Sequence, residues 1–326
     1  MAKRDFWKIV SIIELIIIII LFFFLQTKQN SQEKIEINEE GLLSPRVYAG
    51  ILPAESKLIF NFDPLENVLR EYIDQRNKTI GFYIMNMRDS ASMGINENVG
   101  FEPASLNKVV MAILILRSVE RGYLDLETEL PIKSTDRDAG SGYLYKTTKT
   151  SATIQKLLDL MLNESDNTAF RVLGHQVKEK DWNALTEYLD YYENIDQDLI
   201  SKPSYKVTPV SNSHLFTSLY LSTFLQQNNS EYILRQLTKT SFDIKKIAAL
   251  PEEIIVAQKF GEYYSNNESY FHSCGIMYVD KMKLFYCVMT KDMPRPEAEI
   301  IIGDMVQATY QYLIYEKANI INNFDS

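Results

Sequence analysis

A serine and a lysine stand three residues apart where an apolar helix is predicted to begin. The stretch 101–108 reads Phe-Glu-Pro-Ala-Ser-Leu-Asn-Lys, and an apolar run continues to Leu116. This spacing places Ser105 and Lys108 on one face of the helix. The positive end of the helix dipole favours negative charge on a serine oxygen, and a lysine whose pKa is lowered by burial can accept the serine proton. The pair indicates a nucleophilic serine that works without histidine, although a helix start with a solvated lysine has the same spacing.

Two more motifs could contribute to such a site. Ser165, Asp166 and Asn167 are consecutive and lie between two predicted helices, where the alternative is a turn with Ser165 as the helix cap. Lys259-x-Gly261 lies on a predicted strand, where the alternative is an ordinary strand lysine beside a bend. Neither motif is specific alone, so the argument depends on the order and spacing of all three.

The elements that must position these motifs follow from apolar periodicity and turn signals. The predicted strands cover 78–87, 92–96, 254–260, 270–279 and 282–289. The predicted helices cover 63–75, 105–122, 153–162, 209–226 and 297–315, with another from Thr168. Residues 182–205 give no clear assignment. We expect an α+β fold in which N- and C-terminal strands share one antiparallel sheet, packed with a mainly helical middle subdomain.

Together and in this order, the Ser-x-x-Lys, Ser-Asp-Asn and Lys-x-Gly motifs resemble those of the penicillin-recognising serine hydrolases, which comprise class A β-lactamases and DD-peptidases. The sixty-residue step from Ser105 to Ser165 is similar to that of class A enzymes. Shorter stretches with counterparts in that family cover 140–144, 157–169, 208–209 and 274–278. The resemblance extends over roughly residues 60–318 and implies that family's fold for the domain predicted at 51–326.

The resemblance implies a role for each motif residue. Ser105 would attack an amide carbonyl and form an acyl-enzyme, with Lys108 as its base or as part of the proton relay. Ser165 would pass the proton to the departing nitrogen, and Asn167 would hold Lys108 and the side-chain amide of the substrate. Lys259 would keep the site electropositive and lower the pKa of Lys108.

The resemblance also places the substrate, and three departures bear on it. The oxyanion hole would be the backbone N–H groups of Ser105 and Glu262, next to Gly261. Phe260 stands where the family has a Thr or Ser hydroxyl that binds the substrate carboxylate, and Glu262 stands where a small residue is usual. The Glu-x-x-Leu-Asn sequence that supplies the deacylating base of class A enzymes is missing. Glu193 is at about the right distance for that base, and is otherwise an acid on a solvated loop.

These features predict a serine hydrolase that opens β-lactam amides through a Ser105 acyl-enzyme, as in β-lactam resistance. Without the usual deacylating base, two alternatives stay open: a D-Ala-D-Ala peptidase acting on peptidoglycan stem peptides, and a non-hydrolytic penicillin-binding or sensor domain. The chemistry needs no metal and no organic cofactor, and we expect a monomer. The histidines His175, His214 and His272 belong to no motif, and we expect structural roles for them.

Composition excludes other classes of protein. The 326 residues are 46% hydrophobic and 24% charged, which fits a globular domain with a sizeable core. The net charge of −9, with no basic stripe in the domain, argues against nucleic-acid binding.

The N-terminal stretch predicts a membrane anchor. Residues 6–25 are almost wholly apolar and long enough to span a bilayer as a helix. Basic residues accompany the start of this run, so the stub 1–5 should stay in the cytoplasm and the hydrolase domain should lie outside the cytoplasmic membrane. A cleaved signal peptide is the alternative, but no small-x-small site follows the run. Residues 26–50 are polar and predict a linker.

The two cysteines lie on the last two predicted strands. If their hairpin turns at Asp280 and Lys281, Cys274 and Cys287 are equally far from the turn and face each other as a non-hydrogen-bonded pair. A location outside the cytoplasm would permit a disulfide between them, and two buried free thiols are the alternative.

Overall fold

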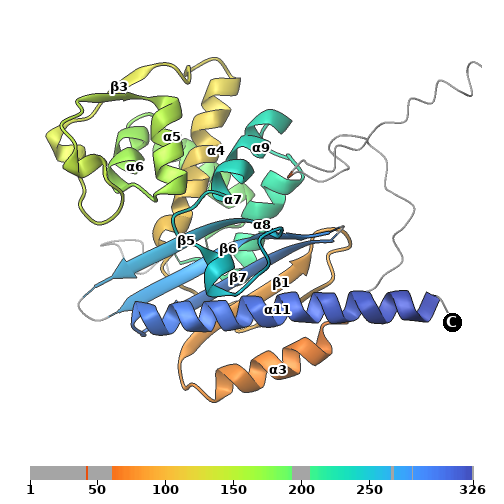
Figure 1. Ribbon diagram of the computed structural model, residues 1–326. Helices are drawn as coiled ribbons and strands as arrows, with labels where there is room; N and C mark the ends of the chain where they lie inside the picture. The colour runs from red at the N-terminus through yellow and green to blue at the C-terminus, as the bar shows by residue number, and fades with distance from the viewer. Residues whose placement is uncertain (1–41, 43–60, 193–205, 266–267, 281, 325–326) are drawn as a thin grey trace, which may run out of the picture.

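One antiparallel sheet is built from strands at both ends of the chain, as Figure 1 shows for the computed structural model. The structure describes residues 42, 61–192, 206–265, 268–280 and 282–324. The sheet order is β2-β1-β7-β6-β5. Its strands are β1 (Thr79–Asn86), β2 (Ser92–Ile95), β5 (Ile255–Tyr264), β6 (Ser269–Val279) and β7 (Met282–Lys291). The pairing of β1 with β7 joins the two ends of the chain and confirms the predicted α+β arrangement.

Helices cover both faces of this sheet (Figure 1). One face carries α3 (Asp63–Asp74) and α11 (Arg295–Phe324), with the short α10 (Ile244–Ile247) beside α11. The other face carries the helical subdomain. Its helices are α4 (Asn107–Glu120), α5 (Ile154–Asn163), α6 (Asn167–Gly174), α7 (Glu179–Tyr188), α8 (Pro209–Tyr220) and α9 (Gln227–Leu237).

The amino-acid pattern explains why α3 and α4 lie where they do. In α3, Pro64 occupies the first turn, and buried Leu65, Leu69 and Ile73 form one stripe that packs toward the sheet. In α4, every residue from 108 to 116 is buried, because this helix is apolar on all sides and runs through the middle of the helical subdomain. A helix surrounded by protein holds its first turn firmly, and that turn carries Lys108.

Three segments differ from the prediction. The helix expected over 209–226 ends at Tyr220, because Ser222 takes a left-handed backbone conformation (φ 50°) and a second helix, α9, begins at Gln227. The segment without an assignment contains most of α7, whose first turn carries two acidic residues. A small second sheet, β3 (Glu129–Pro131) with β4 (Ser151–Thr153), was not predicted because each strand is only three residues long.

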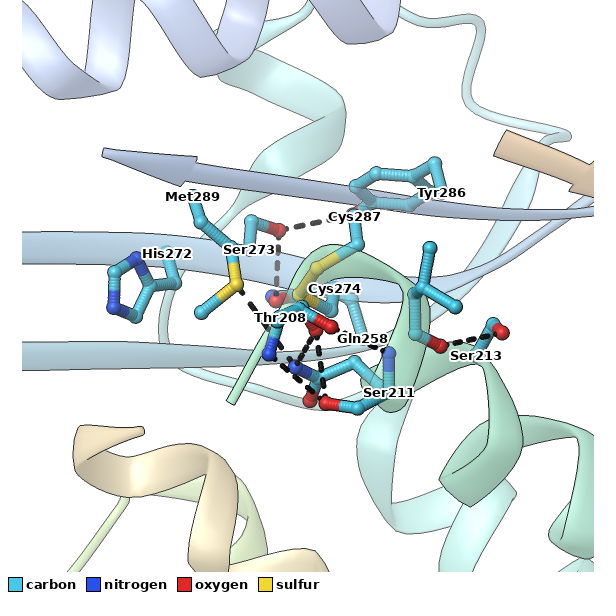
Figure 2. The surroundings of a disulfide bond; sticks show 12 residues. Thr208, Ser211, Ser213, Gln258, His272, Ser273, Cys274, Tyr286, Cys287 and Met289 are labelled. Carbon is cyan, nitrogen blue, oxygen red and sulfur yellow. Dashed lines mark hydrogen bonds between the residues drawn. A yellow bond between two sulfur atoms is a disulfide. The ribbon is translucent and has the colours of Figure 1, made fainter. Parts of the chain in front are cut away.

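The hairpin of β6 and β7 has the predicted register. Val279 pairs with Met282 across the turn, and Cys274 lies directly opposite Cys287. The structure joins the two sulfur atoms in a disulfide on the sheet face that meets the start of α8 (Figure 2). Both cysteines are 0% exposed. On the neighbouring strand positions, the Ser273 hydroxyl lies within hydrogen-bond distance of the Tyr286 hydroxyl (3.0 Å).

The predicted N-terminal segments lie outside the described residues, apart from Leu42. These are the cytoplasmic stub 1–5, the membrane-spanning segment 6–25 and the linker 26–50. Among the helices that are described, none combines the length and the apolar character needed to cross a membrane.

Candidate active site

Ser105 lies on a single 3-10 turn, η1 (Ala104–Leu106), that leads directly into α4. Ala104 has a left-handed backbone (φ 49°), an uncommon conformation for a residue with a side chain, so the chain turns sharply just before the serine. Leu106 is fully buried and anchors the turn, whereas Ser105 is only partly buried. The serine hydroxyl is therefore held in a fixed position that a substrate can reach.

Lys108 brings the serines together. Its Nζ lies 2.8 Å from Ser105 Oγ, 2.6 Å from the Ser165 carbonyl oxygen and 3.1 Å from Ser165 Oγ. The Asn167 Oδ1 atom is also 2.6 Å from this nitrogen. The carbonyl oxygen of Ser165 and the amide oxygen of Asn167 can only accept hydrogen bonds. In a neutral amine they take both N–H groups, which leaves the nitrogen lone pair for the Ser105 hydroxyl.

The environment of Lys108 favours this neutral form. The side chain is 3% exposed, and burial lowers the pKa of Lys108 to about 7, against the partial compensation of the negative charges on Asp166 and Asp138. A lysine that titrates near neutral pH can accept a proton from Ser105.

Asp166, not Ser165, caps the helix after the second motif. The carboxylate of Asp166 accepts a hydrogen bond from the backbone N–H of Ala169, which is the N-cap bond of α6. Its other oxygen accepts the N–H groups of Tyr143 and Leu144, and so fixes the loop over the site. The cap leaves Ser165 free: its backbone is left-handed (φ 54°), and both its carbonyl and its hydroxyl face Lys108.

Lys259 reaches the same serine from strand β5. Its Nζ lies 2.9 Å from Ser165 Oγ and 3.0 Å from the Phe260 carbonyl oxygen. The side chain is 0% exposed, and burial together with the nearby Lys108 lowers the pKa of Lys259 well below its ordinary value. The Ser165 hydroxyl thus lies between two amines and can pass a proton from one side of the site to the other.

Gly261 lets β5 approach the serine. A Cβ atom at this position would lie 3.1 Å from the Pro103 carbonyl oxygen and 3.4 Å from Ala104 Cβ, so a side chain would force the strand away from η1. This close approach places β5 against η1, the turn that carries Ser105, and the sequence predicts an oxyanion hole from the backbone N–H groups of Ser105 and Glu262. The Glu262 carboxylate pairs with Arg295 Nη1 at 2.9 Å, at the start of α11.

Phe260 has no polar group to offer a substrate. Its ring packs against Phe242 and Phe271, with ring centroids 5.7 and 6.5 Å away, and it is 7% exposed. The ring centroid also lies 4.1 Å from Lys259 Nζ. The side of the Lys259 amine that a hydroxyl-bearing residue would leave open to an anion therefore faces an aromatic ring.

Asp138 is a residue of this cluster that no motif indicated. Its Oδ1 atom accepts a hydrogen bond from Asn167 Nδ2 at 3.1 Å, and its Oδ2 atom pairs with Arg171. Asp138 lies in the connection between β3 and β4 and precedes Asn167 by 29 residues, so no helical or strand spacing connects the two. Only the glycines and small polar residues of that loop, which permit a close approach, were a signal in the sequence.

His272 supports the segment in front of Ser105. The Thr290 backbone N–H donates to Nδ1 (3.3 Å), so Nε2 carries the hydrogen and donates to the Glu102 carbonyl oxygen (2.9 Å). Burial lowers the pKa of His272 to about 4, which keeps the ring neutral at physiological pH. His175 and His214 bond to groups outside the cluster, which agrees with structural roles.

Glu193 lies outside the described residues. Within the described part of the chain, no group of three or more His, Cys, Asp or Glu side chains is arranged to hold a metal ion. The residues that the structure does bring together are Ser105, Lys108, Ser165, Asn167 and Lys259.

Comparisons with known proteins bear on the family and the fold of this chain. The model of the beta-lactamase enzyme family matches residues 64–313. Beta-lactamase VEB-1 of Pseudomonas aeruginosa is 23% identical over 271 residues, which cover 77% of this chain and 89% of that protein. A β-lactamase structure from Sphaerobacter thermophilus has a TM-score of 0.68 at 21% identity, and covers 78% of this chain and 98% of its own. The structure of PBP-A has a TM-score of 0.68 at 18% identity, over 78% of this chain and 97% of its own. Both of these solved structures share the fold of this chain.

Proposed function

The chain belongs to the beta-lactamase enzyme family, as a serine hydrolase of the β-lactamase type, and on this premise we propose that it opens β-lactam amides through an acyl-enzyme on Ser105. The observation that carries the proposal is the position of Lys108 Nζ, 2.8 Å from Ser105 Oγ and bonded to two obligate acceptors. In a neutral lysine held in this way both N–H groups are taken, and the lone pair is left for a serine hydroxyl, of which Ser105 Oγ at 2.8 Å is nearer than Ser165 Oγ at 3.1 Å.

The proposed acylation uses the two amines and the two serines in turn. Lys108 takes the proton of Ser105 while Oγ attacks the amide carbonyl carbon. The negative charge that forms on the carbonyl oxygen is stabilised by the backbone N–H groups of Ser105 and Glu262. The C–N bond then breaks, and the departing nitrogen receives a proton from Ser165, which is resupplied by Lys108. Lys259, also bonded to the Ser165 hydroxyl, orients this relay.

Turnover requires a second step, in which water releases the acyl group. We propose Glu193 as the base for that water, on the evidence of its position in the sequence alone. If Glu193 does not serve, the acyl-enzyme persists, and a D-Ala-D-Ala peptidase or a penicillin-binding sensor becomes the better description. The missing Glu-x-x-Leu-Asn sequence and the apolar Phe260 favour this second candidate. A variant of PBP-A has been solved as an acyl-enzyme complex with penicillin G.

We further propose that the enzyme is a monomer anchored in the cytoplasmic membrane by residues 6–25, with the hydrolase domain outside. The apolar length of that segment supports the anchor, and the Cys274–Cys287 disulfide fits an oxidising compartment. Fractionation of cells that express the full chain, followed by protease treatment of intact spheroplasts, tests this. Protection of the domain from external protease would overturn it.

The test of the catalytic proposal is time-resolved intact mass spectrometry of the protein with a penicillin and a chromogenic cephalosporin. An adduct that appears and decays while product accumulates supports a β-lactamase. An adduct that persists supports the second candidate, and the variant Glu193→Gln then behaves as wild type. The matched control is Ser105→Ala: an adduct that still forms on this variant would exclude Ser105 as the nucleophile.

A further inference from the structure

The amide group of Asn167 has one orientation that suits the proposed reaction. Its oxygen must face Lys108, because the lysine nitrogen needs an acceptor there if its lone pair is to point at Ser105. Rotating the amide by half a turn would present its NH₂ group to Lys108. The nitrogen of Lys108 would then become the acceptor, and its lone pair would no longer be free for the serine proton.

Asp138 distinguishes these two orientations. In the structure Asn167 Nδ2 donates to Asp138 Oδ1 at 3.1 Å. In the rotated amide the Asn167 oxygen would face this carboxylate, and two acceptors would repel each other. The carboxylate is itself held in place, because the Gly140 backbone N–H donates to Oδ1 at 2.8 Å and Arg171 pairs with Oδ2.

The surrounding loop leaves room for this contact. A Cβ atom at Gly140 would lie 2.9 Å from Asn167 Nδ2 and 3.0 Å from Asp138 Oδ1, so a side chain there would disturb both groups. The Asp138 backbone N–H donates to the Thr168 hydroxyl at 3.0 Å, which attaches the loop to α6. The Asp138 side chain is only 19% exposed, so water competes weakly for its oxygens.

We propose that Asp138 is a positioning residue: through Asn167 it keeps the Lys108 lone pair directed at Ser105. This inference rests on the proposed acyl-serine function. Asp138 lies outside the three sequence motifs, and its side chain forms no hydrogen bond with Ser105 or Lys108.

The charges around Lys108 determine the sign of the expected effect. The carboxylates of Asp138 and Asp166 both raise the pKa of Lys108 and so oppose the effect of burial. Lys259 reaches the same Ser165 hydroxyl, and the Phe170 ring centroid lies 6.0 Å from Lys108 Nζ. Removing the charge of Asp138 therefore lowers the pKa of Lys108, whereas removing its partner Arg171 leaves the carboxylate less screened and raises that pKa.

The experiment compares four variants of the full chain. Asp138→Ala removes both the acceptor and the charge, and Asp138→Asn removes the charge but keeps an oxygen for Asn167. Arg171→Gln removes the counter-ion. The matched control is Asp136→Asn, because Asp136 lies two residues before Asp138, is 3% exposed and bonds to His175 instead of Asn167.

Two measurements are made on each variant. The first is the pH profile of the acylation rate constant with a chromogenic cephalosporin. The second is the pKa of Lys108, read by NMR from the lysine ¹³Cε resonance that is absent in Lys108→Met. The NMR measurement of the Lys108 pKa needs no substrate. If wild type does not acylate, the proposed function is wrong, and the Lys108 pKa values of the variants still test the role of Asp138.

We expect Asp138→Ala to acylate about tenfold or more slowly at pH values above the Lys108 titration, because the amide of Asn167 is no longer oriented. In Asp138→Asn the Lys108 titration and the acid limb move together to lower pH by about 0.5–1 pH unit, and in Arg171→Gln they move to higher pH. Asp136→Asn loses stability but keeps the wild-type titration. If Asp138→Ala and Asp138→Asn keep the wild-type Lys108 pKa and lose activity only in proportion to stability, as the control does, Asp138 is structural and the inference is wrong.

Discussion

Lys108 and Lys259 are both buried amines bonded to Ser165, yet their surroundings differ in kind. Lys108 is placed among groups that stabilise a charge or accept N–H groups: two carbonyl-type oxygens at 2.6 Å and the field of two carboxylates. Lys259 has the Ser165 hydroxyl, one backbone carbonyl and an aromatic ring. Burial lowers the pKa of both, but only Lys108 has negative charges nearby to oppose it. The carboxylates thus keep one of two otherwise similar lysines titrating near neutral pH, where a general base is useful.

The largest expected effect is a difference in acylation rate between variants of the two lysines. Lys108→Met removes the group that accepts the Ser105 proton, and we expect acylation by a fluorescent penicillin to slow by about 10³-fold. Lys259→Met leaves that group in place and removes only the second partner of Ser165, so a loss of roughly tenfold is expected. The rate of covalent labelling measures both. Equal losses would show that the two amines share the role of base.

The pH profile should report Lys108. Its pKa is lowered to about 7, so below that pH the amine is protonated and cannot accept the serine proton. We expect the acylation rate constant of wild type to rise as the pH increases through about 7 and to level off above it. Stopped-flow measurements between pH 5 and 9 check this. A flat profile over the range would mean that Lys108 is not the titrating base.

Stability should show the cost of burying each amine. Both lysines have a lower pKa in the folded chain than the ordinary 10.5, so from about pH 7 upward the unfolded chain binds more protons and stability rises with pH. At pH 7 we expect the free energy of unfolding of Lys259→Met to be about 2 kcal/mol higher than that of wild type. The gain for Lys108→Met should be smaller, since its amine has more acceptors. Urea titrations at pH 7 and 9.5 test this. We expect Lys259→Met to gain more stability than Lys108→Met at pH 7, and both gains over wild type to be smaller at pH 9.5.

The smallest effect concerns the ring beside Lys259. Phe260→Thr replaces that ring with a hydroxyl that can donate a hydrogen bond to a carboxylate, so a carboxylate-bearing β-lactam should acylate about tenfold faster relative to its methyl ester. The Thr variant should also lose about 2 kcal/mol of stability, because Phe260 packs against Phe242 and Phe271. Phe260→Leu is the matched control for the packing loss. An equal acid-to-ester ratio in both variants would contradict a role for position 260 in anion binding.

The sequence allowed the three motifs to be found because each is a short run whose residues stay together in any fold. Ser105 with Lys108 depends on one helical turn, and Lys259 with Gly261 depends on the alternation of one strand. The shared sheet also followed, since strands at both chain ends must pair to bury their apolar faces. Figure 1 shows the resulting layers.

Asp138 could not be predicted in the same way. Its contact with Asn167 depends on how the loop before β4 folds back over α6, and no spacing in the sequence encodes that path. The cap at Asp166 was missed for a related reason, because a serine followed by an aspartate offers two possible caps and only the tertiary contacts of Tyr143 and Leu144 select the second. The break at Ser222 that separates α8 from α9 likewise has no strong helix breaker in the sequence.

The buried position of the disulfide imposes an order of events on maturation. Cys274 and Cys287 are 0% exposed in the folded domain, so neither an oxidising enzyme nor a small reductant can reach the sulfur atoms once the sheet has closed against α8. Oxidation must therefore come before the last stage of folding. A chain that folds completely under reducing conditions would be trapped as a dithiol. The same sequence would then exist in two long-lived forms with one fold, which differ in whether Cys274 and Cys287 are reduced or joined in a disulfide.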